Sequence, residues 1–452
     1  MHIHILGICG TFMGGLAQIA KALGHEVTGS DQNMYPPMSD ELVKLNIDVM
    51  NGYEPEHLNP QPDLVLVGNT LSRGNPAIEY MLNQRLSFMS GPEWLFREVL
   101  HKRHVLAVAG THGKTTTTTI LSWVLEFAGL NPSFLIGGVA ENFAKSASYT
   151  NSEYFVIEAD EYDTAFFDKR SKFVHYRPNT LVINNIEHDH ADIFHDLAAI
   201  RHEFHNLVRI LPETAKIIYP ASDEEIERVL NMGCWAASET FLGVDAEWSI
   251  VDASCDYQDF SIIHNGKTVG KVSWQTIGEH NAHNALAAII AAKNVGVSAE
   301  KACQALSEFK SVKRRLECIF DSNDIRIYDD FAHHPTAIMK SLQAIKSHAK
   351  NGRVIAIMEP RSNTMRMGVH AETLATSFAD ADRIFLYQAK DLKWNIADHM
   401  NELGDRCRVF EDVDKIVELV GKETQPHDYI VIMSNGAFGG IYQKLIKRLN
   451  KL

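Results

Sequence analysis

The sequence predicts an α/β fold of three consecutive units with parallel sheets. Short apolar runs alternate with helical patterns along almost the whole chain, which is typical of βαβ units. The chain has 452 residues, a length near that of three domains of ~150 residues. Two basic clusters, Lys102-Arg103 and Lys313-Arg314-Arg315, each precede a new run of strands. We therefore expect units over residues 1–104, 105–312 and 313–452.

Each predicted element follows from its local pattern. Short apolar runs between Gly, Pro, Asn or Asp predict strands, and apolar residues three and four apart predict helices. For the first unit we expect strands at 3–6, 26–28 and 63–67, a helix at 16–23 and a short helix after the turn Gly91-Pro92. For the second we expect strands at 104–109, 154–157 and 181–184, antiparallel strands at 248–251 and 260–263, and helices at 281–293 and 299–309. For the third we expect strands at 325–328, 354–358, 383–386 and 429–433.

Composition excludes several classes of protein. Acidic residues outnumber basic ones by 57 to 43, and the formal charge is −14 at pH 7. This charge repels phosphate backbones, and without a basic patch no nucleic-acid partner is expected. Six scattered cysteines without a CxxC pair predict neither a disulfide framework nor a zinc site. The opening residues are typical of a strand, and no apolar stretch reaches the ~18–20 residues of a membrane span. We expect a cytoplasmic protein with no membrane partner, and the sequence gives no indication of its oligomeric state.

The most informative motif is Gly110-Thr111-His112-Gly113-Lys114-Thr115-Thr116, which follows a predicted strand and opens a helix. Glycines let backbone amides curl around phosphate oxygens at a helix N-terminus, where the helix dipole also favours anions. We expect Lys114 to reach the β- and γ-phosphates of a nucleotide and the Thr115 hydroxyl to bind Mg²⁺.

The loop differs from the common Walker motif in one position. Val108 stands five residues before Gly113, where the usual motif has a glycine, and this argues against ordinary GTPases and many kinases. The five threonines at 115–119 are poor helix formers, so their presence at a helix start favours a role for their hydroxyl groups.

Carboxylates and histidines follow the next two strands of the same unit. Glu158 opens the acidic run 158–163, and His190 lies in the loop 184–192. A carboxylate at the carboxyl end of a strand beside a phosphate loop is a typical metal ligand, so both residues are candidates for Mg²⁺ or Mn²⁺. Solvated surface loops are the alternative. His280, Asn281 and Asn284 can hydrogen-bond a nucleotide base, although helix capping is the simpler role for any one of them.

Together these motifs resemble the Mur ligases, ATP-dependent enzymes that form amide bonds in bacterial cell-wall precursors. The residues that carry the resemblance, in the family's order and approximate spacing, are the loop at 110–116, Glu158, Asp189-His190, Gly278-x-His280-Asn281-x-x-Asn284-Ala285, Arg315-Leu316-Glu317 and Asp329-Asp330-Phe331-Ala332-His333-His334-Pro335. The resemblance implies the family's architecture, in which Rossmann-like domains flank a central P-loop ATPase domain. It implies ATP and Mg²⁺ as cofactors. Some relatives have a carbamylated lysine at the position of Phe204, so we expect none here.

Within the family, the chain is most similar to the branch that acts on UDP-N-acetylmuramate. The runs 333–336 and 7–15 point to that branch. Its members add either L-alanine or the recycled tripeptide L-alanyl-γ-D-glutamyl-meso-diaminopimelate. The stretches 10–15, 185–194 and 359–368 look like those of the tripeptide-adding members. Arg361 and Arg366 would then bind peptide carboxylates, with ordinary surface arginines as the alternative.

The resemblance implies a role for each candidate residue. ATP phosphorylates the muramyl carboxylate, and the incoming amine attacks the resulting acyl-phosphate. The implied catalytic residues are Lys114, Arg315 and His333, with the choice between base and orienter open for His333. The implied ATP-binding residues are Gly110, Thr111, His112, Gly113, Lys114, Thr115, Thr116, His280, Asn281, Arg315 and Asp330. The implied metal ligands are Thr115, Glu158 and His190, and the implied UDP-sugar-binding residues are Gly10, Gly14 and Asp31.

Two other classes of function compete with this interpretation. A strand, a glycine turn, a helix and Asp31 also fit an NAD-dependent dehydrogenase, which leaves Lys114 and the His/Asp loops unexplained. A regulatory nucleotide-binding module without chemistry is the second alternative.

Overall fold

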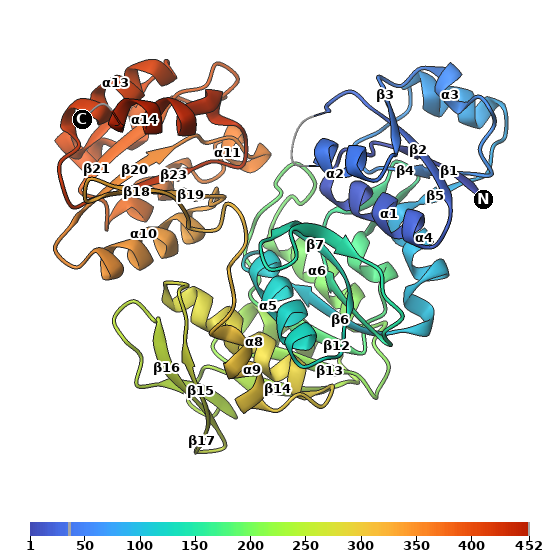
Figure 1. Cartoon of the computed structure of the whole chain (residues 1–452), viewed down its shortest axis with the longest axis horizontal. Helices are drawn as coiled ribbons and strands as arrows, with labels where there is room; N and C mark the ends of the chain where they lie inside the picture. The colour runs from blue at the N-terminus through green and yellow to red at the C-terminus, as the bar shows by residue number, and fades with distance from the viewer. Residues whose placement is uncertain (35–37, 451–452) are drawn as a thin grey trace.

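The computed structural model describes residues 1–34 and 38–450, which form three α/β units (Figure 1). Figure 1 shows the first unit in blue and the third in orange to red, on opposite sides of the green and yellow central unit. Each unit contains a mainly parallel sheet with helices packed on it. In the described part of the chain, no helix combines the length and the apolar character needed to cross a membrane.

The first sheet has five parallel strands in the order β3-β2-β1-β4-β5. Its strands are β1 (His2–Leu6), β2 (Glu26–Asp31), β3 (Asp48–Asn51), β4 (Leu64–Val67) and β5 (Phe88–Ser90). Its helices are α1 (Thr11–Ala22), α2 (Met38–Lys44), α3 (Pro76–Asn83) and α4 (Gly91–Glu98), with 3₁₀ turns η1 (Pro55–Leu58) and η2 (Leu100–Lys102). The sequence placed Gly91-Pro92 in a turn before a helix, and this was wrong. They form the first turn of α4, because Ser90 Oγ accepts a hydrogen bond from Glu93 N and proline is tolerated at that position.

The central sheet has ten strands in the order β17-β16-β15-β14-β13-β12-β6-β9-β7-β8. Its strands are β6 (His104–Ala109), β7 (Ser133–Ala140), β8 (Lys145–Ser148), β9 (Tyr154–Glu158), β12 (Thr180–Ile183), β13 (Lys216–Pro220), β14 (Ala237–Phe241), β15 (Trp248–Val251), β16 (Asp259–His264) and β17 (Lys267–Ser273). A separate hairpin contains β10 (Asp163–Ala165) and β11 (Asp168–Ser171). The antiparallel pairing predicted for residues 248–251 and 260–263 is confirmed, and these strands extend the parallel sheet.

The helices of the central unit are α5 (Lys114–Phe127), α6 (Leu197–Val208), α7 (Glu224–Asn231), α8 (Glu279–Lys293) and α9 (Ala299–Leu306), with the 3₁₀ turn η3 (Lys172–His175). Ile120, Leu121, Val124 and Leu125 recur at helical spacing and form one fully buried face of α5. Phe204 on α6 is also fully buried and packs against Phe173, with ring centroids 5.4 Å apart. An apolar, fully buried side chain therefore occupies position 204.

The third sheet has six strands in the order β18-β19-β23-β20-β21-β22. Its strands are β18 (Glu317–Ser322), β19 (Ile325–Asp330), β20 (Arg353–Met358), β21 (Arg383–Tyr387), β22 (Cys407–Phe410) and β23 (Asp428–Met433). Its helices are α10 (Pro335–Ala349), α11 (Asn363–Met367), α12 (Ala371–Leu374), α13 (Val413–Glu423) and α14 (Ile441–Leu449), with 3₁₀ turns η4 (Ala375–Phe378), η5 (Ile396–His399), η6 (Asn401–Arg406) and η7 (Phe438–Gly440). Among the described strands of this sheet, β18 alone is antiparallel to its neighbour.

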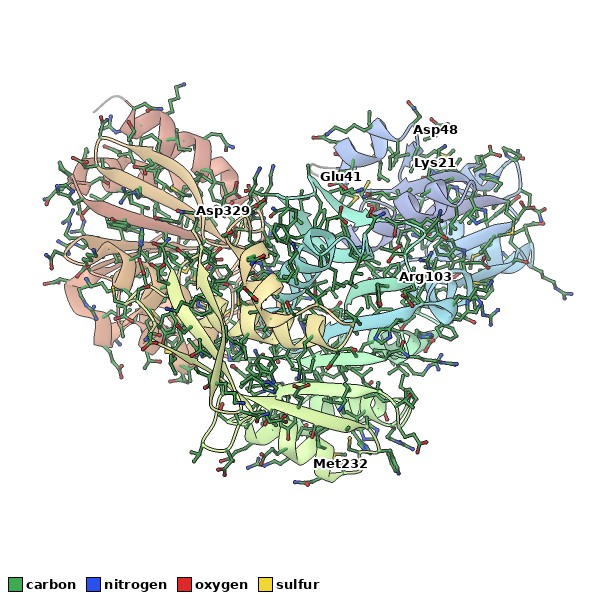
Figure 2. The ribbon with its side chains drawn as sticks, turned by 60° about the horizontal axis from the view of Figure 1, so that its bottom comes forward. Lys21, Glu41, Asp48, Arg103, Met232 and Asp329 are labelled. Atoms are coloured by element: carbon green, nitrogen blue, oxygen red, sulfur yellow. The ribbon has the colours of Figure 1, made fainter. Side chains whose placement is uncertain are left out.

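Sheet topology places the candidate site at one edge of the central sheet. The strand β6 lies between β9 and β12, and all three run parallel. The phosphate loop therefore leaves the sheet between the acidic run after β9 and the loop after β12, as expected at the carboxyl edge of such a sheet. The first unit contacts the central one elsewhere. Glu41 is labelled in Figure 2. Its Oε2 accepts hydrogen bonds from Gln18 Nε2 at 2.6 Å and from Ser146 Oγ of the central unit at 3.0 Å.

Candidate active site

A cleft of about 1010 Å³ separates the central unit from the third unit. On the central side it is lined by the phosphate loop, the residues after β9 and β12, and the start of α8. On the other side it is lined by Arg315, the residues that follow β19, and α10. Of the catalytic and ATP-binding candidates, all but Gly110 line this cleft.

The backbone of the phosphate loop is held in place by two asparagines that follow β12. Gly110 has φ +132° and Gly113 has φ +79°, conformations that residues with a side chain rarely adopt. Asn185 Oδ1 accepts a hydrogen bond from His112 N at 2.8 Å, and Asn184 Nδ2 donates to Thr117 Oγ1 at 3.0 Å. These contacts within the protein fix the shape of the loop, which lowers the ordering cost of phosphate binding.

Lys114 is buried at the start of α5 and paired with a buried carboxylate. Its Nζ donates to Gly110 O at 2.7 Å and to Glu161 Oε2 at 2.7 Å. Burial opposes the charge on Lys114, but Glu161 and Asp160 outweigh it and raise the pKa of the ammonium group. The side chain is a fixed cation inside the loop, as phosphate binding requires.

Thr115 and Glu158 form a compact oxygen cluster beside the loop. Thr115 Oγ1 donates to Glu158 Oε1 at 3.0 Å, and Glu158 Oε2 accepts from Gly137 N at 2.7 Å. Burial raises the pKa of Glu158, with Lys114 opposing the shift. A buried carboxylate beside a hydroxyl is a donor set that suits Mg²⁺, and a bound cation would also stabilise the charged form of Glu158.

His190 belongs to a neighbouring cluster with Asp160 and Glu161. Single ligand atoms of these three residues lie within 4.8 Å of one another. The Nε2–H of His190 donates to Glu161 Oε1 at 3.0 Å, and this interaction outweighs burial and raises the pKa of His190. Burial also disfavours the charge on Asp160, but Lys172 and Lys114 lower its pKa to about 2. The structure thus groups Thr115 with Glu158, and His190 with two carboxylates that the sequence did not single out as ligands.

The residues after β19 bring further polar groups to the cleft. The Nδ1–H of His333 donates to Phe331 O at 2.9 Å, which leaves the Nε2 lone pair free, 3.9 Å from Asp189 Oδ2. Burial lowers the pKa of His333, so the ring is neutral at pH 7. Asp330 is occupied within its own unit, because its carboxylate accepts hydrogen bonds from Leu316 N and Ser341 Oγ.

Side-chain hydrogen bonds join the third unit to the loop after β12. Thr336 Oγ1 donates to Glu187 Oε2 at 2.6 Å, and Thr364 Oγ1 donates to Asp189 Oδ1 at 2.9 Å. These contacts close the cleft along one side.

His280 and Asn281 open α8 at the rim of the cleft. Asn281 Nδ2 donates to Ile277 O at 2.8 Å, so its side chain already makes a local backbone contact. Burial lowers the pKa of His280 to about 3, which keeps this ring neutral.

Besides Gly110, five predicted binding residues lie outside the lining of the cleft. Asp31 Oδ2 accepts from Cys9 N at 2.9 Å and so fixes the glycine turn of the first unit. Gly10 is the N-cap of α1, and Gly14 lies on the same helix beside Met38. Arg366 Nη2 is 2.9 Å from Asp391 Oδ2, and Arg361 Nη1 is 3.8 Å from Glu359 Oε1.

Sequence reasoning missed the partners of the predicted residues more often than the residues themselves. Asn184 and Asn185 were visible after a predicted strand, and their position offered a signal. Lys172 and Thr364 gave none, because they reach the site only through the fold.

The chain is similar to known proteins along its whole length. Family models match in three consecutive parts: the Mur ligase family catalytic domain at residues 2–103, the Mur ligase middle domain at 108–292, and the Mur ligase glutamate ligase domain at 314–436. A UDP-N-acetylmuramate–L-alanyl-γ-D-glutamyl-meso-2,6-diaminoheptandioate ligase of Haemophilus influenzae is 51% identical over 449 residues, which cover 99% of both chains.

Two further matches show how the similarity falls off. A UDP-N-acetylmuramate–L-alanine ligase of Clostridium tetani is 29% identical over 449 residues, covering 96% of this chain and 95% of that protein. The crystal structure of a murein peptide ligase from Psychrobacter arcticus superimposes with a TM-score of 0.77 at 47% identity, covering 100% of this chain and 99% of that one.

Proposed function

The chain belongs to the Mur ligase family, and from this premise we propose that it joins L-alanyl-γ-D-glutamyl-meso-diaminopimelate to UDP-N-acetylmuramate. As a Mur ligase it forms an amide bond at the expense of ATP. The observation that carries the ATP-dependent step is the convergence of Lys114, Thr115 and Arg315 at one phosphate loop. The choice of tripeptide over L-alanine is supported by 51% identity to a relative named for the tripeptide, against 29% to one named for L-alanine.

The cationic side chains of the cleft stabilise the charge that develops during phosphoryl transfer. Lys114 and the loop amides bind the β- and γ-phosphates, and Arg315 adds a second positive charge from the other side of Thr115. Charge develops on the transferring oxygens in the transition state, so fixed donors aimed at them lower the barrier. Thr115 and Glu158 would hold Mg²⁺, with His190 of the neighbouring cluster as the third proposed ligand, and the bound ion would neutralise part of the phosphate charge. His280, Asn281 and Asp330 complete the nucleotide site at its rim.

We assign His333 as the proton acceptor for the incoming amine. Its Nδ1–H donates a hydrogen bond to Phe331 O, so the lone pair on Nε2 is available to accept a proton. A neutral imidazole with one nitrogen anchored is the arrangement that general-base catalysis needs.

The first unit would hold the UDP portion of the sugar nucleotide. The N-terminus of α1, capped by Gly10, offers backbone amides to a pyrophosphate, and Asp31 keeps the preceding turn in shape. The three functional parts are then residues 1–104, 105–312 and 313–452. Arg361 and Arg366 lie after β20 and would bind peptide carboxylates there. Because the reaction consumes ATP, we place it in the cytoplasm.

The deciding experiment offers UDP-N-acetylmuramate and ATP with either the tripeptide or L-alanine and measures released phosphate. We expect phosphate release that depends on both substrates, with a strong preference in kcat/KM for the tripeptide. A preference for L-alanine would assign the chain to the alternative reaction of the same branch.

A further inference from the structure

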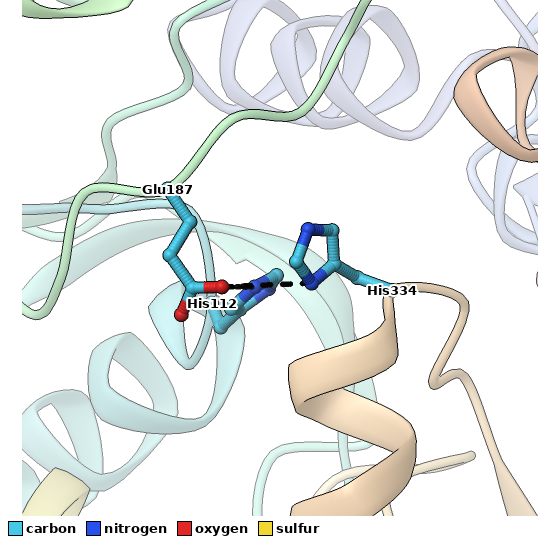
Figure 3. Close-up of side chains that lie close together, drawn as sticks. All are labelled: His112, Glu187 and His334. Carbon is cyan, nitrogen blue, oxygen red and sulfur yellow. Dashed lines mark ion pairs between the residues drawn. The ribbon is translucent and has the colours of Figure 1, made fainter. Parts of the chain in front are cut away.

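A second histidine cluster lies in the cleft, apart from the groups assigned to Mg²⁺. It consists of His112, Glu187 and His334, whose ligand atoms all lie within 4.8 Å of one another (Figure 3). Glu187 Oε2 is 3.6 Å from His112 Nε2 and 3.7 Å from His334 Nδ1. Figure 3 shows both imidazole rings turned toward the same carboxylate. These separations are too long for hydrogen bonds.

The distances from Glu187 Oε2 to the two histidine nitrogens suit a single metal ion bound by all three side chains. Ligand atoms at ~2.0–2.1 Å from a tetrahedral zinc ion stand about 3.4 Å apart, close to the two observed distances. His112 Nε2 is buried and, among the described residues, has no hydrogen-bond partner. An unsatisfied buried nitrogen that faces a carboxylate marks a position that a cation would stabilise.

Each ligand is also held by a second group. Thr336 Oγ1 donates to Glu187 Oε2 at 2.6 Å and so fixes the carboxylate. The Nε2–H of His334 faces His188 O at 3.3 Å, which fixes the tautomer that leaves Nδ1 unprotonated. His334 Nδ1 accepts the capping hydrogen bond of α10 from Thr336 N at 3.3 Å, and a bound ion would replace this contact. The backbone of His112 is fixed by Asn185. Such outer contacts are typical of metal-binding histidines.

We propose that His112 Nε2, Glu187 Oε2 and His334 Nδ1 bind one zinc-class divalent ion. Two imidazoles and one carboxylate favour Zn²⁺ or Co²⁺ over Mg²⁺, which prefers oxygen ligands.

The ion would couple metal binding to the arrangement of two units. His112 and Glu187 belong to the central unit, whereas His334 is the N-cap of α10 in the third unit. A site whose ligands come from both units exists only when the cleft is closed, so the ion binds the closed form and raises its population.

Cobalt is the probe for the test, because its visible absorption reports coordination. The full-length protein is titrated with Co²⁺ in the presence of saturating Mg²⁺ and no nucleotide. The ligand variants are His334→Asn, Glu187→Gln and His112→Asn. Asparagine at 334 preserves helix capping, and glutamine at 187 preserves an acceptor for Thr336. His190→Asn removes the neighbouring cluster. His399→Asn is the matched control, since His399 pairs with Glu372 at 3.2 Å but belongs to no three-ligand group in the described chain.

We expect a four-coordinate Co²⁺ spectrum for the wild type, His190→Asn and His399→Asn, and at least tenfold weaker binding in the three ligand variants. Zn²⁺ should contract the wild type in small-angle scattering and leave His334→Asn unchanged. Co²⁺ binding that survives in the ligand variants, or that is lost in His190→Asn, would overturn the proposal. Circular dichroism of each variant separates lost binding from lost folding.

Discussion

Arg315 Nη2 donates a hydrogen bond to Thr115 Oγ1 across 3.1 Å, and these two residues stand 200 positions apart in the chain. The guanidinium comes from the segment that leaves the central unit, and the hydroxyl belongs to the first turn of α5. Burial lowers the pKa of Arg315 from its usual value, with Asp330 and Glu158 opposing the shift. A guanidinium group keeps its charge in proteins. A cation from the junction between units thus completes the phosphate loop.

Replacement of Arg315 by lysine should lower kcat by roughly 10²–10³-fold. Lysine keeps the charge but cannot direct the planar fork of guanidinium donors to Thr115 and to a phosphate at once. Steady-state phosphate release measures the effect. The exposed neighbour Lys313 provides the control, and Lys313→Ala should keep wild-type rates. An equal loss of kcat in both variants would show that the rate depends on the junction between the units and not on the guanidinium group of Arg315.

Lys114→Ala should abolish ligation, with turnover reduced by roughly 10³-fold or more, because the loop loses its phosphate cation. The same change removes the partner of Glu161 Oε2 and leaves this carboxylate, which is 2% exposed, with the contact to His190, so it should lower stability. Thermal unfolding would reveal that loss, and Lys114→Ala/Glu161→Gln should regain it. Restored stability without restored turnover is the expected result for the double variant. Near-normal turnover of Lys114→Ala would refute the ATP-site assignment.

Arg361→Ala and Arg366→Ala should each raise the KM for the tripeptide about 10–100-fold, with the KM for ATP unchanged. A charged hydrogen bond to a carboxylate contributes about 1.5–3 kcal/mol, which corresponds to this range. Initial rates at varied tripeptide concentration measure it. Arg408 pairs with Glu423 at 3.0 Å at the far end of the sheet, so Arg408→Ala serves as the control. An unchanged KM for the tripeptide in both variants would show that Arg361 and Arg366 are ordinary surface arginines.

The first unit should lose stability as pH falls below 6.5. His4 is fully buried in β1 and bonded to Thr28 and Ser30, and burial together with His2 and His57 lowers its pKa to about 3. In the unfolded chain His4 is protonated near pH 6.5, whereas in the folded unit it stays neutral until about pH 3. The free energy of unfolding therefore decreases as pH falls from 6.5 toward 3. The loss is about 1.4 kcal/mol per pH unit, or about 2 kcal/mol at pH 5.

Hydrogen exchange of the β1 peptide at pH 7.5 and pH 5 measures this effect locally. His4→Gln removes the titrating group, so its pH dependence should be smaller, whereas the exposed His101→Gln should behave like the wild type. The same pH dependence in His4→Gln would mean that another group is responsible.

Local patterns predicted the parts of the molecule that depend on neighbouring residues. The phosphate loop, the buried face of α5 and most strands follow from short stretches of sequence. α1 begins at Thr11 rather than at residue 16, because Gly14 and Gly15 carry no apolar side chain to mark its first turns. The run of threonines favoured a role for hydroxyl groups, but Thr118 Oγ1 and Thr119 Oγ1 donate to helix carbonyls at 2.7 Å.

Local sequence patterns could not predict contacts between segments that are far apart in the chain. The position of Glu158 at the end of a strand marked it as a candidate ligand, but nothing in the sequence indicated that Glu161 would pair with Lys114. Sheet order and unit docking decide such pairings.

The loop after β12 serves two neighbours at once. Asn184 and Asn185 shape the phosphate loop, while Glu187 and Asp189 hold the third unit. Nucleotide binding and docking of the third unit therefore act on one short piece of backbone. Linkage makes this relation reciprocal: by whatever factor ATP strengthens docking, docking strengthens the affinity for ATP. A substitution that loosens only the Thr364–Asp189 contact should thus be measurable as weaker nucleotide binding, although Thr364 itself does not line the cleft.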